Sequence, residues 1–300
     1  MASTDILEKD QHHAPESTDQ LWEGGIEPFK ASYGKLMMWY FLLSDAFTFS
    51  GFLIAYGSLR FSMPTWPVPD FVFQSFPGGI EHKPLMFVSL MTFILIVSSV
   101  TMVRGVQEGH RGNVKGIVFW MFLTILGGSA FLGCQAWEWT TLIKGENMSV
   151  TRNPFGRHEI AGTYTMDEHG HPYEKGVTPE TFKKSEGYLI HAEHDANHEV
   201  VADENGNTKF IQRTYITETG EKGQLEFGPK QFGALFFFIT GFHGFHVFSG
   251  VLFLAIIAMN VGSGIYEKRK NHYEMVEKIG LYWHFVDLVW VFVFLVFYLL

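Results

Sequence analysis

The chain has 300 residues, of which 47% are hydrophobic and 16% aromatic, and its formal net charge is −9. An acidic balance argues against nucleic acid as a partner. The single cysteine, Cys134, excludes an internal disulfide framework and any metal site that needs a cysteine pair. The aromatic and apolar content is too high for an ordinary soluble domain. Five long apolar runs instead indicate membrane helices, because about 20 apolar residues cross a bilayer.

Composition divides the chain into four parts. Residues 1–34 are polar and predict a disordered cytoplasmic tail. Residues 35–143 hold three apolar runs, and residues 229–300 hold two more. The sequence therefore predicts an all-α membrane protein with five transmembrane helices in a bundle. The expected helices lie at about 35–59, 84–103, 116–143, 229–261 and 281–300.

Residues 144–228 are hydrophilic and acidic, and they predict a long extramembrane insert between the third and fourth helices. The Thr-Pro-Glu sequence at 178–180 is typical of a helix start. Asn205-Gly206, between short apolar pairs, is typical of a hairpin. We therefore expect a small folded cap and not merely a tether.

Three histidines of the insert are weak candidates for a metal site. His191, His194 and His198 are three and four residues apart, so they would share a face if this segment were a helix. Imidazole nitrogens are common ligands of transition metals. The rest of the segment holds no strong ligand pattern, and short polar helices often carry such histidines without function.

The short loops predict the orientation in the membrane. Basic residues gather at 104–115 and 262–280, and with five helices both loops lie on the same side as the N-terminus. Such loops face the cytoplasm. We therefore expect a multi-pass protein of a bacterial inner membrane, with the acidic insert and the C-terminus in the periplasm.

Ionisable side chains within the apolar runs are the candidate functional residues, because charge at membrane depth is costly unless it is paired. Asp45 has two interpretations: a structural carboxyl bonded to Ser44 or Thr48, or a carboxyl that senses or relays protons. Glu138 is expected near the interface, as a snorkelling carboxylate or as a proton-related group. The remaining candidates are His243, His246, His284 and Asp287. Some of these four residues and Glu138 are expected to form an interhelical polar cluster.

Two motifs carry a family resemblance. Residues 237–250 read FFITGFHGFHVFSG, and residues 282–290 read YWHFVDLVW. Shorter matches at 43–45, 98–101 and 135–139 follow in the same order. With these motifs the chain resembles subunit III of the haem–copper terminal oxidases, in the short five-helix bacterial form. It departs from that family in having Asp45 where a glutamate is usual, and in the length of its insert.

The resemblance implies an accessory subunit without cofactors, in a proton-pumping aa3-type cytochrome c oxidase. Such a subunit packs on subunit I, beside subunit II, binds phospholipid between its helices, and supports stability and proton uptake. Haem and copper would lie in the partner subunits, which carry the chemistry of oxygen reduction. The acidic insert could attract cytochrome c or a neighbouring respiratory complex.

Three alternative functions compete with this one. Subunit III of a quinol oxidase is the main alternative. A membrane di-haem cytochrome b is remote, because His243 and His246 lie three apart on one helix and cannot ligate opposite faces of one haem. A transporter is disfavoured because the sequence shows no internal repeat of broken apolar segments.

Overall fold

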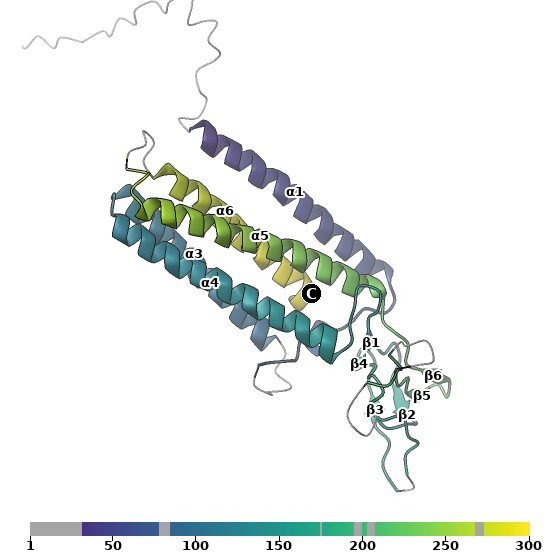
Figure 1. Ribbon diagram of the computed structural model, residues 1–300. Helices are drawn as coiled ribbons and strands as arrows, with labels where there is room; N and C mark the ends of the chain where they lie inside the picture. Colours follow the sequence, from purple (N-terminus) through teal and green to yellow (C-terminus); the bar gives the residue numbers. More distant parts are fainter. Residues whose placement is uncertain (1–31, 78–84, 175, 195–199, 203–207, 268–272) are drawn as a thin grey trace, which may run out of the picture.

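The computed structural model describes residues 32–77, 85–174, 176–194, 200–202, 208–267 and 273–300. Within this part, five helices are long and apolar enough to span a membrane. They pack as one bundle (Figure 1), which confirms the predicted fold class. They are α1 (Tyr33–Ser62), α3 (Met86–His110), α4 (Val114–Thr140), α5 (Lys230–Gly262) and α6 (Glu274–Phe294).

Three short helical segments accompany the long helices in the described ranges. The one-turn helix α2 (Pro69–Val72) lies in the connection between α1 and α3. The π-helical turns η2 (Thr141–Gly145) and η3 (Leu295–Leu299) extend α4 and α6. Helix α3 runs on to His110 and α6 begins at Glu274, beyond the apolar runs that predict them. Apolar runs mark the part of a helix that crosses the membrane, and polar residues continue the helix past it.

Polar bonds join α3 to α6 along their interface. The indole nitrogen of Trp283 donates to Ser98 Oγ at 2.9 Å, and that of Trp290 donates to Thr92 Oγ1 at 3.0 Å. On α4, a Cβ added at Gly128 would lie 2.4 Å from the Trp283 ring. A small residue at this position therefore lets the large indole lie between the helices.

The described part of the insert between α4 and α5 forms two small antiparallel sheets. One pairs β1 (Phe155–Arg157) with β4 (Gly187–Leu189). The Thr-Pro-Glu sequence leads directly into a strand, so the helix predicted there is wrong. The hairpin predicted at Asn205-Gly206 lies outside the described residues. The second sheet has the order β3 (Thr181–Phe182), β2 (Gly162–Tyr164), β5 (Thr214–Thr217) and β6 (Lys222–Gln224).

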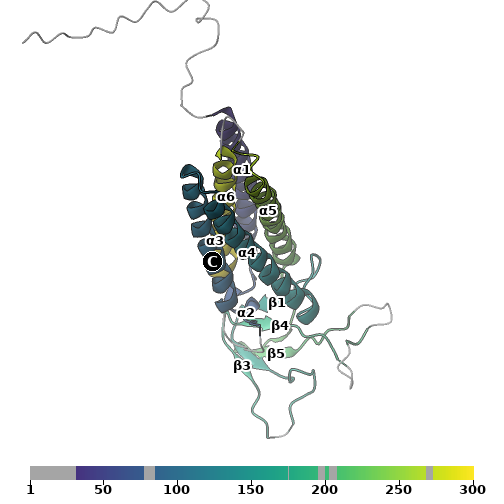
Figure 2. The ribbon, with the colours of Figure 1, turned by 60° about the vertical axis from the view of Figure 1, so that its left-hand side comes forward.

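The insert lies at one end of the bundle, opposite the start of α1 (Figure 2); we call this end the insert end. A bridge between Asn153 and Gly228 forms the neck of the insert. The Asn153 amide also donates to Pro229 O at 3.1 Å. Farther out, Arg157 Nη2 donates to Pro64 O at 3.1 Å. The insert is therefore a folded cap that is held against the bundle, as the sequence predicts.

Candidate functional site

Asp45 and His246 meet between α1 and α5. Asp45 Oδ2 lies 3.4 Å from His246 Nε2, and 16% and 10% of the two side chains are exposed. The hydroxyls of Ser44 and Thr48 do not bond Asp45; they donate to backbone carbonyls of their own helix. The interpretation of Asp45 as a carboxyl bonded to those neighbours is therefore wrong, and the imidazole across the interface is its partner.

The second nitrogen of His246 fixes the orientation of its ring. His246 Nδ1 lies 2.8 Å from Phe242 O, and a carbonyl only accepts, so Nδ1 carries a hydrogen. Nε2 therefore faces Asp45 across the interface. The two groups are in contact at 3.4 Å but are not hydrogen-bonded, because Asp45 Oδ2 has no hydrogen-bond partner among the described residues.

The turn of α5 that carries His246 is fixed from α6. The hydroxyl of Tyr282 donates to His246 O at 3.1 Å and lies 2.9 Å from Ser249 Oγ. Phe49 of α1 packs its ring edge against the imidazole of His246. Three helices thus determine where the Asp45–His246 pair lies.

Glu138 is buried, with 4% of the residue exposed. Its carboxylate accepts from the hydroxyl of Tyr298 in η3. The expectation that it snorkels to the interface is therefore wrong. The sequence does not identify Tyr298 as the partner of Glu138, because aromatic residues are common at the end of an apolar run.

Of the other three candidates, His284 and Asp287 both lie beside Ser99 of α3. His284 Nδ1 lies 2.6 Å from Ser99 Oγ, and the Ser99 hydroxyl also interacts with the Asp287 carboxyl, although without good hydrogen-bond geometry. His243 is fully buried, with its ring against Trp290, and its nitrogens have no hydrogen-bond partner among the described residues. No direct hydrogen bond joins Glu138, His243, His246, His284 and Asp287 to one another within the described part of the chain. Spacing along one helix shows which residues share a face, but not which helix lies opposite.

The helix needed for the histidine metal site is absent where the structure describes the segment. Ala192 and His194 instead form β-bridges to Phe210 and Val200. His198 lies outside the described residues. Within the described part, no group of three or more His, Cys, Asp or Glu side chains could hold a metal ion.

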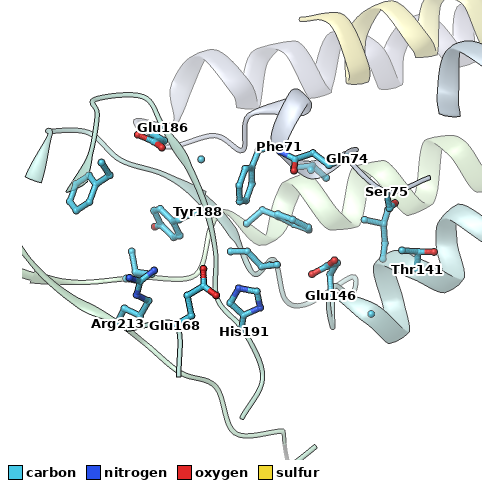
Figure 3. A pocket seen from close by; sticks show the side chains of 18 of the residues that line it. Phe71, Gln74, Ser75, Thr141, Glu146, Glu168, Glu186, Tyr188, His191 and Arg213 are labelled. Atoms are coloured by element: carbon cyan, nitrogen blue, oxygen red, sulfur yellow. The ribbon is translucent and has the colours of Figure 1, made fainter. Parts of the chain in front are cut away.

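A cavity of about 710 Å³ lies between the insert and the ends of α2 and α4 (Figure 3). Arg213 lines it and is held by Glu180 at 2.6 Å and by the ring face of Tyr164. His191 also lines it, and burial lowers the pKa of this imidazole. The sequence did not predict this cavity, because its walls come from three separate segments. Further lining residues include Phe71, Gln74, Ser75, Thr141, Glu146, Glu168, Glu186 and Tyr188.

Fold and site together define a multi-spanning membrane protein in which Asp45 and Glu138 are held by side chains of neighbouring helices. A family model described as cytochrome c oxidase subunit III matches residues 221–300, which contain α5 and α6. Cytochrome c oxidase subunit 3 of Corynebacterium diphtheriae is 25% identical over 75% of this chain and 70% of its own length. The subunit of that name from Thermostichus vulcanus is 24% identical, over 87% of this chain and 84% of its own length.

Quinol oxidase subunit 3 of Bacillus spizizenii is 23% identical over 88% of this chain and 86% of its own length. These matches make the chain similar to subunit III of the haem–copper oxidases and support the resemblance that its motifs carry. The relatives named cytochrome c oxidase are subunits of an oxidoreductase complex. Relatives of both oxidase types align over most of their length, so their similarity to this chain does not distinguish cytochrome c oxidase from quinol oxidase.

Proposed function

We propose that this chain is an accessory, cofactor-free subunit of a proton-pumping aa3-type cytochrome c oxidase. It packs on subunit I, beside subunit II, and supports the stability and proton uptake of the catalytic subunit. The observation that carries the proposal is the contact between the carboxyl of Asp45 and the imidazole of His246, which lies within the membrane bundle. Two relatives named cytochrome c oxidase subunit 3 support this type of oxidase, and the quinol oxidase relative supports the alternative.

The test of the proton role separates the polar contact from the titratable group. Asp45→Asn keeps a polar contact to His246 but cannot hold an exchangeable acid proton, whereas Asp45→Glu keeps the carboxyl. We expect both complexes to assemble, with slower proton uptake during turnover only in Asp45→Asn. Equal uptake in Asp45→Asn and wild type would show that the pair is structural.

Co-purification tests the identity of the complex. An affinity tag on this chain should retain a haem-bearing subunit in mild detergent. A copper-binding subunit II with a cysteine pair among the retained proteins would support the cytochrome c oxidase. A subunit II without that pair would support the quinol oxidase. A haem absorbance band in the purified chain alone would support the remote cytochrome b.

The proposed orientation places the insert in the periplasm of a bacterium and the N-terminal tail in the cytoplasm. It is supported by Arg104, Arg111 and Lys115, which lie towards the end opposite the insert. The C-terminal residue Leu300 lines a hollow with Arg157 of the insert, so both belong to the insert end. A membrane-impermeant thiol reagent tests this with single cysteines at Lys222 and Lys115 in a Cys134→Ser background. Labelling of intact cells should reach Lys222→Cys alone.

The acidic insert is a proposed docking surface for cytochrome c or for a neighbouring respiratory complex. We also propose that phospholipid binds non-covalently between the helices. Haem and copper belong to the partner subunits in this proposal. Deletion of the insert tests its docking role.

A further inference from the structure

Two arginines from distant parts of the chain line one hollow at the insert end. Arg60 lies in the last turn of α1, and Arg157 ends β1 of the insert. The hollow between them has a volume of about 510 Å³. Trp66 and Asp70 of the α1–α3 connection and the end of the chain complete its walls. It shares no lining residue with the cavity of Figure 3.

The two guanidinium groups are positioned but not neutralised. Arg157 is anchored by its bond to Pro64 O. Arg60 lies beside Tyr56, whose hydroxyl accepts from the Trp66 indole at 3.1 Å. Nη1 of Arg60 is buried and has no hydrogen-bond partner in the described part of the chain. Neither arginine forms an ion pair with Asp70 or with any other described carboxylate.

An apolar stripe on α1 leads to this hollow. Phe47, Ile54 and Phe61 follow one another at intervals of seven residues, so they lie on one helix face. Their exposed fractions are 71%, 68% and 88%. Phe61 itself lines the hollow, next to Arg60. A tryptophan such as Trp66 is typical of the membrane–water interface. The hollow thus combines cationic groups at headgroup level with a hydrocarbon-facing stripe below them.

We propose that Arg60 and Arg157 bind the phosphate group of a phospholipid, with an acyl chain along Phe61 and Ile54. Guanidinium groups present planar pairs of N–H donors that match phosphate oxygens. The shared chemistry is a phosphate anion, and the stripe on α1 favours a lipid headgroup over free phosphate. This site goes beyond the phospholipid proposed between helices, because Arg157 belongs to the insert. It does not depend on which electron donor the oxidase uses.

The competing explanation is that Arg60 merely snorkels into water. The test counts phospholipids retained by the tagged, assembled complex after washing in mild detergent, using native mass spectrometry. We expect Arg60→Gln/Arg157→Gln to lose one phospholipid per copy of this chain. Arg104→Gln is the matched control, because Arg104 bonds Gln107 at the other end of the bundle. It should retain the wild-type lipid count.

Two further variants separate binding from folding. Arg60→Gln alone leaves the bond between Arg157 and Pro64 in place, so a lipid lost from this variant cannot result from a displaced insert. Arg60→Lys/Arg157→Lys keeps both charges and should retain the lipid more weakly. Assembly with the haem-bearing subunit is scored separately on the same samples, so failure of the proposed function would be seen as lost assembly and not as lost lipid.

A free anion is distinguished by adding radiolabelled inorganic phosphate to the same complexes. Phosphate binding that disappears in the double glutamine variant, with an unchanged lipid count, would support the phosphate site and overturn the lipid as its ligand. An unchanged lipid count together with unchanged phosphate binding would overturn the site itself.

Discussion

Tyr298 bonds Glu138 across the insert end of the bundle, although 160 positions separate them in the chain. Its hydroxyl lies 3.0 Å and 3.2 Å from the two carboxylate oxygens. Both residues are buried, and Tyr298 belongs to the π-helical turn η3. The bond therefore ties the last turn of the chain to α4.

Tyr298→Phe should destabilise the complex, because it leaves the buried carboxyl of Glu138 without this hydroxyl. Losing a partner of a buried polar group costs about 1–3 kcal/mol. We expect a lower melting temperature of the tagged complex in detergent. Tyr40→Phe is the control, since Tyr40 is 60% exposed on α1. Equal melting temperatures for the two variants would contradict a stabilising bond.

Asp287 gives a prediction that differs from the one its sequence context suggests. Pairing with an imidazole would make Asp287→Asn better tolerated than Asp287→Leu. Neither oxygen has a hydrogen bond of good geometry among the described residues, although Ser99 lies beside the carboxyl. Replacing a poorly satisfied buried group by an apolar one of similar size is often neutral or stabilising. We therefore expect Asp287→Leu to keep or raise the melting temperature and to be tolerated as well as Asp287→Asn. A loss confined to Asp287→Leu would reveal a polar partner.

His158 makes the stability of the insert depend on pH. Its ring stacks on Phe182, with centroids 3.6 Å apart, and its Nε2 lies 2.7 Å from the Tyr164 hydroxyl. Burial, and secondly the charge of Arg213, lowers the pKa of His158 to about 4. An unfolded histidine titrates near pH 6.5. Between these values the unfolded insert binds a proton that the folded insert does not.

The insert should therefore be most stable above pH 6.5 and lose stability as the pH falls towards 4, by on the order of 3 kcal/mol at most. Limited proteolysis of the insert in the assembled complex at pH 7.5 and pH 5 measures this. His158→Phe should reduce the pH dependence, and the lowered pKa of His191 accounts for some of the rest. His171→Phe is the control, because 77% of the His171 side chain is exposed. An unchanged dependence in His158→Phe would contradict the assignment.

The sequence predicts the helices well because hydrocarbon imposes a strong and local requirement on composition. It cannot predict partners that come from another helix. From the sequence alone, Asp45 is explained equally well as a carboxyl bonded within its own helix, because its partner lies on α5. Tyr298 and Ser99 become visible as partners only once α6 lies against α4 and α3. The strands of the insert are two to four residues long, too short for a periodic signal, and its Thr-Pro-Glu sequence has local features shared by helix starts and extended segments.

The structure also shows where the insert can be removed. Asn153 and Gly228 pair at its neck, and Gly228 N donates to Asn153 O at 3.0 Å. Residues 154–227 can therefore be replaced by a short Gly/Ser bridge without separating the ends of α4 and α5. The small core of the insert is distinct from that of the bundle. It consists of Tyr164, Phe182, Ile190 and Leu225.

We expect the shortened chain to assemble with the oxidase and to support turnover with a small artificial donor. Electron delivery from the native donor should fall, most clearly at low salt, because charge attraction is screened over about 8 Å at physiological ionic strength. A variant that keeps the insert but carries Glu168→Gln and Glu186→Gln tests whether charge alone is responsible. If native delivery and association with neighbouring complexes survive the deletion unchanged at low salt, the insert is a cover for the oxidase and not a docking surface. If delivery falls in the deletion but not in the glutamine variant, docking depends on the shape of the insert or on its other carboxylates.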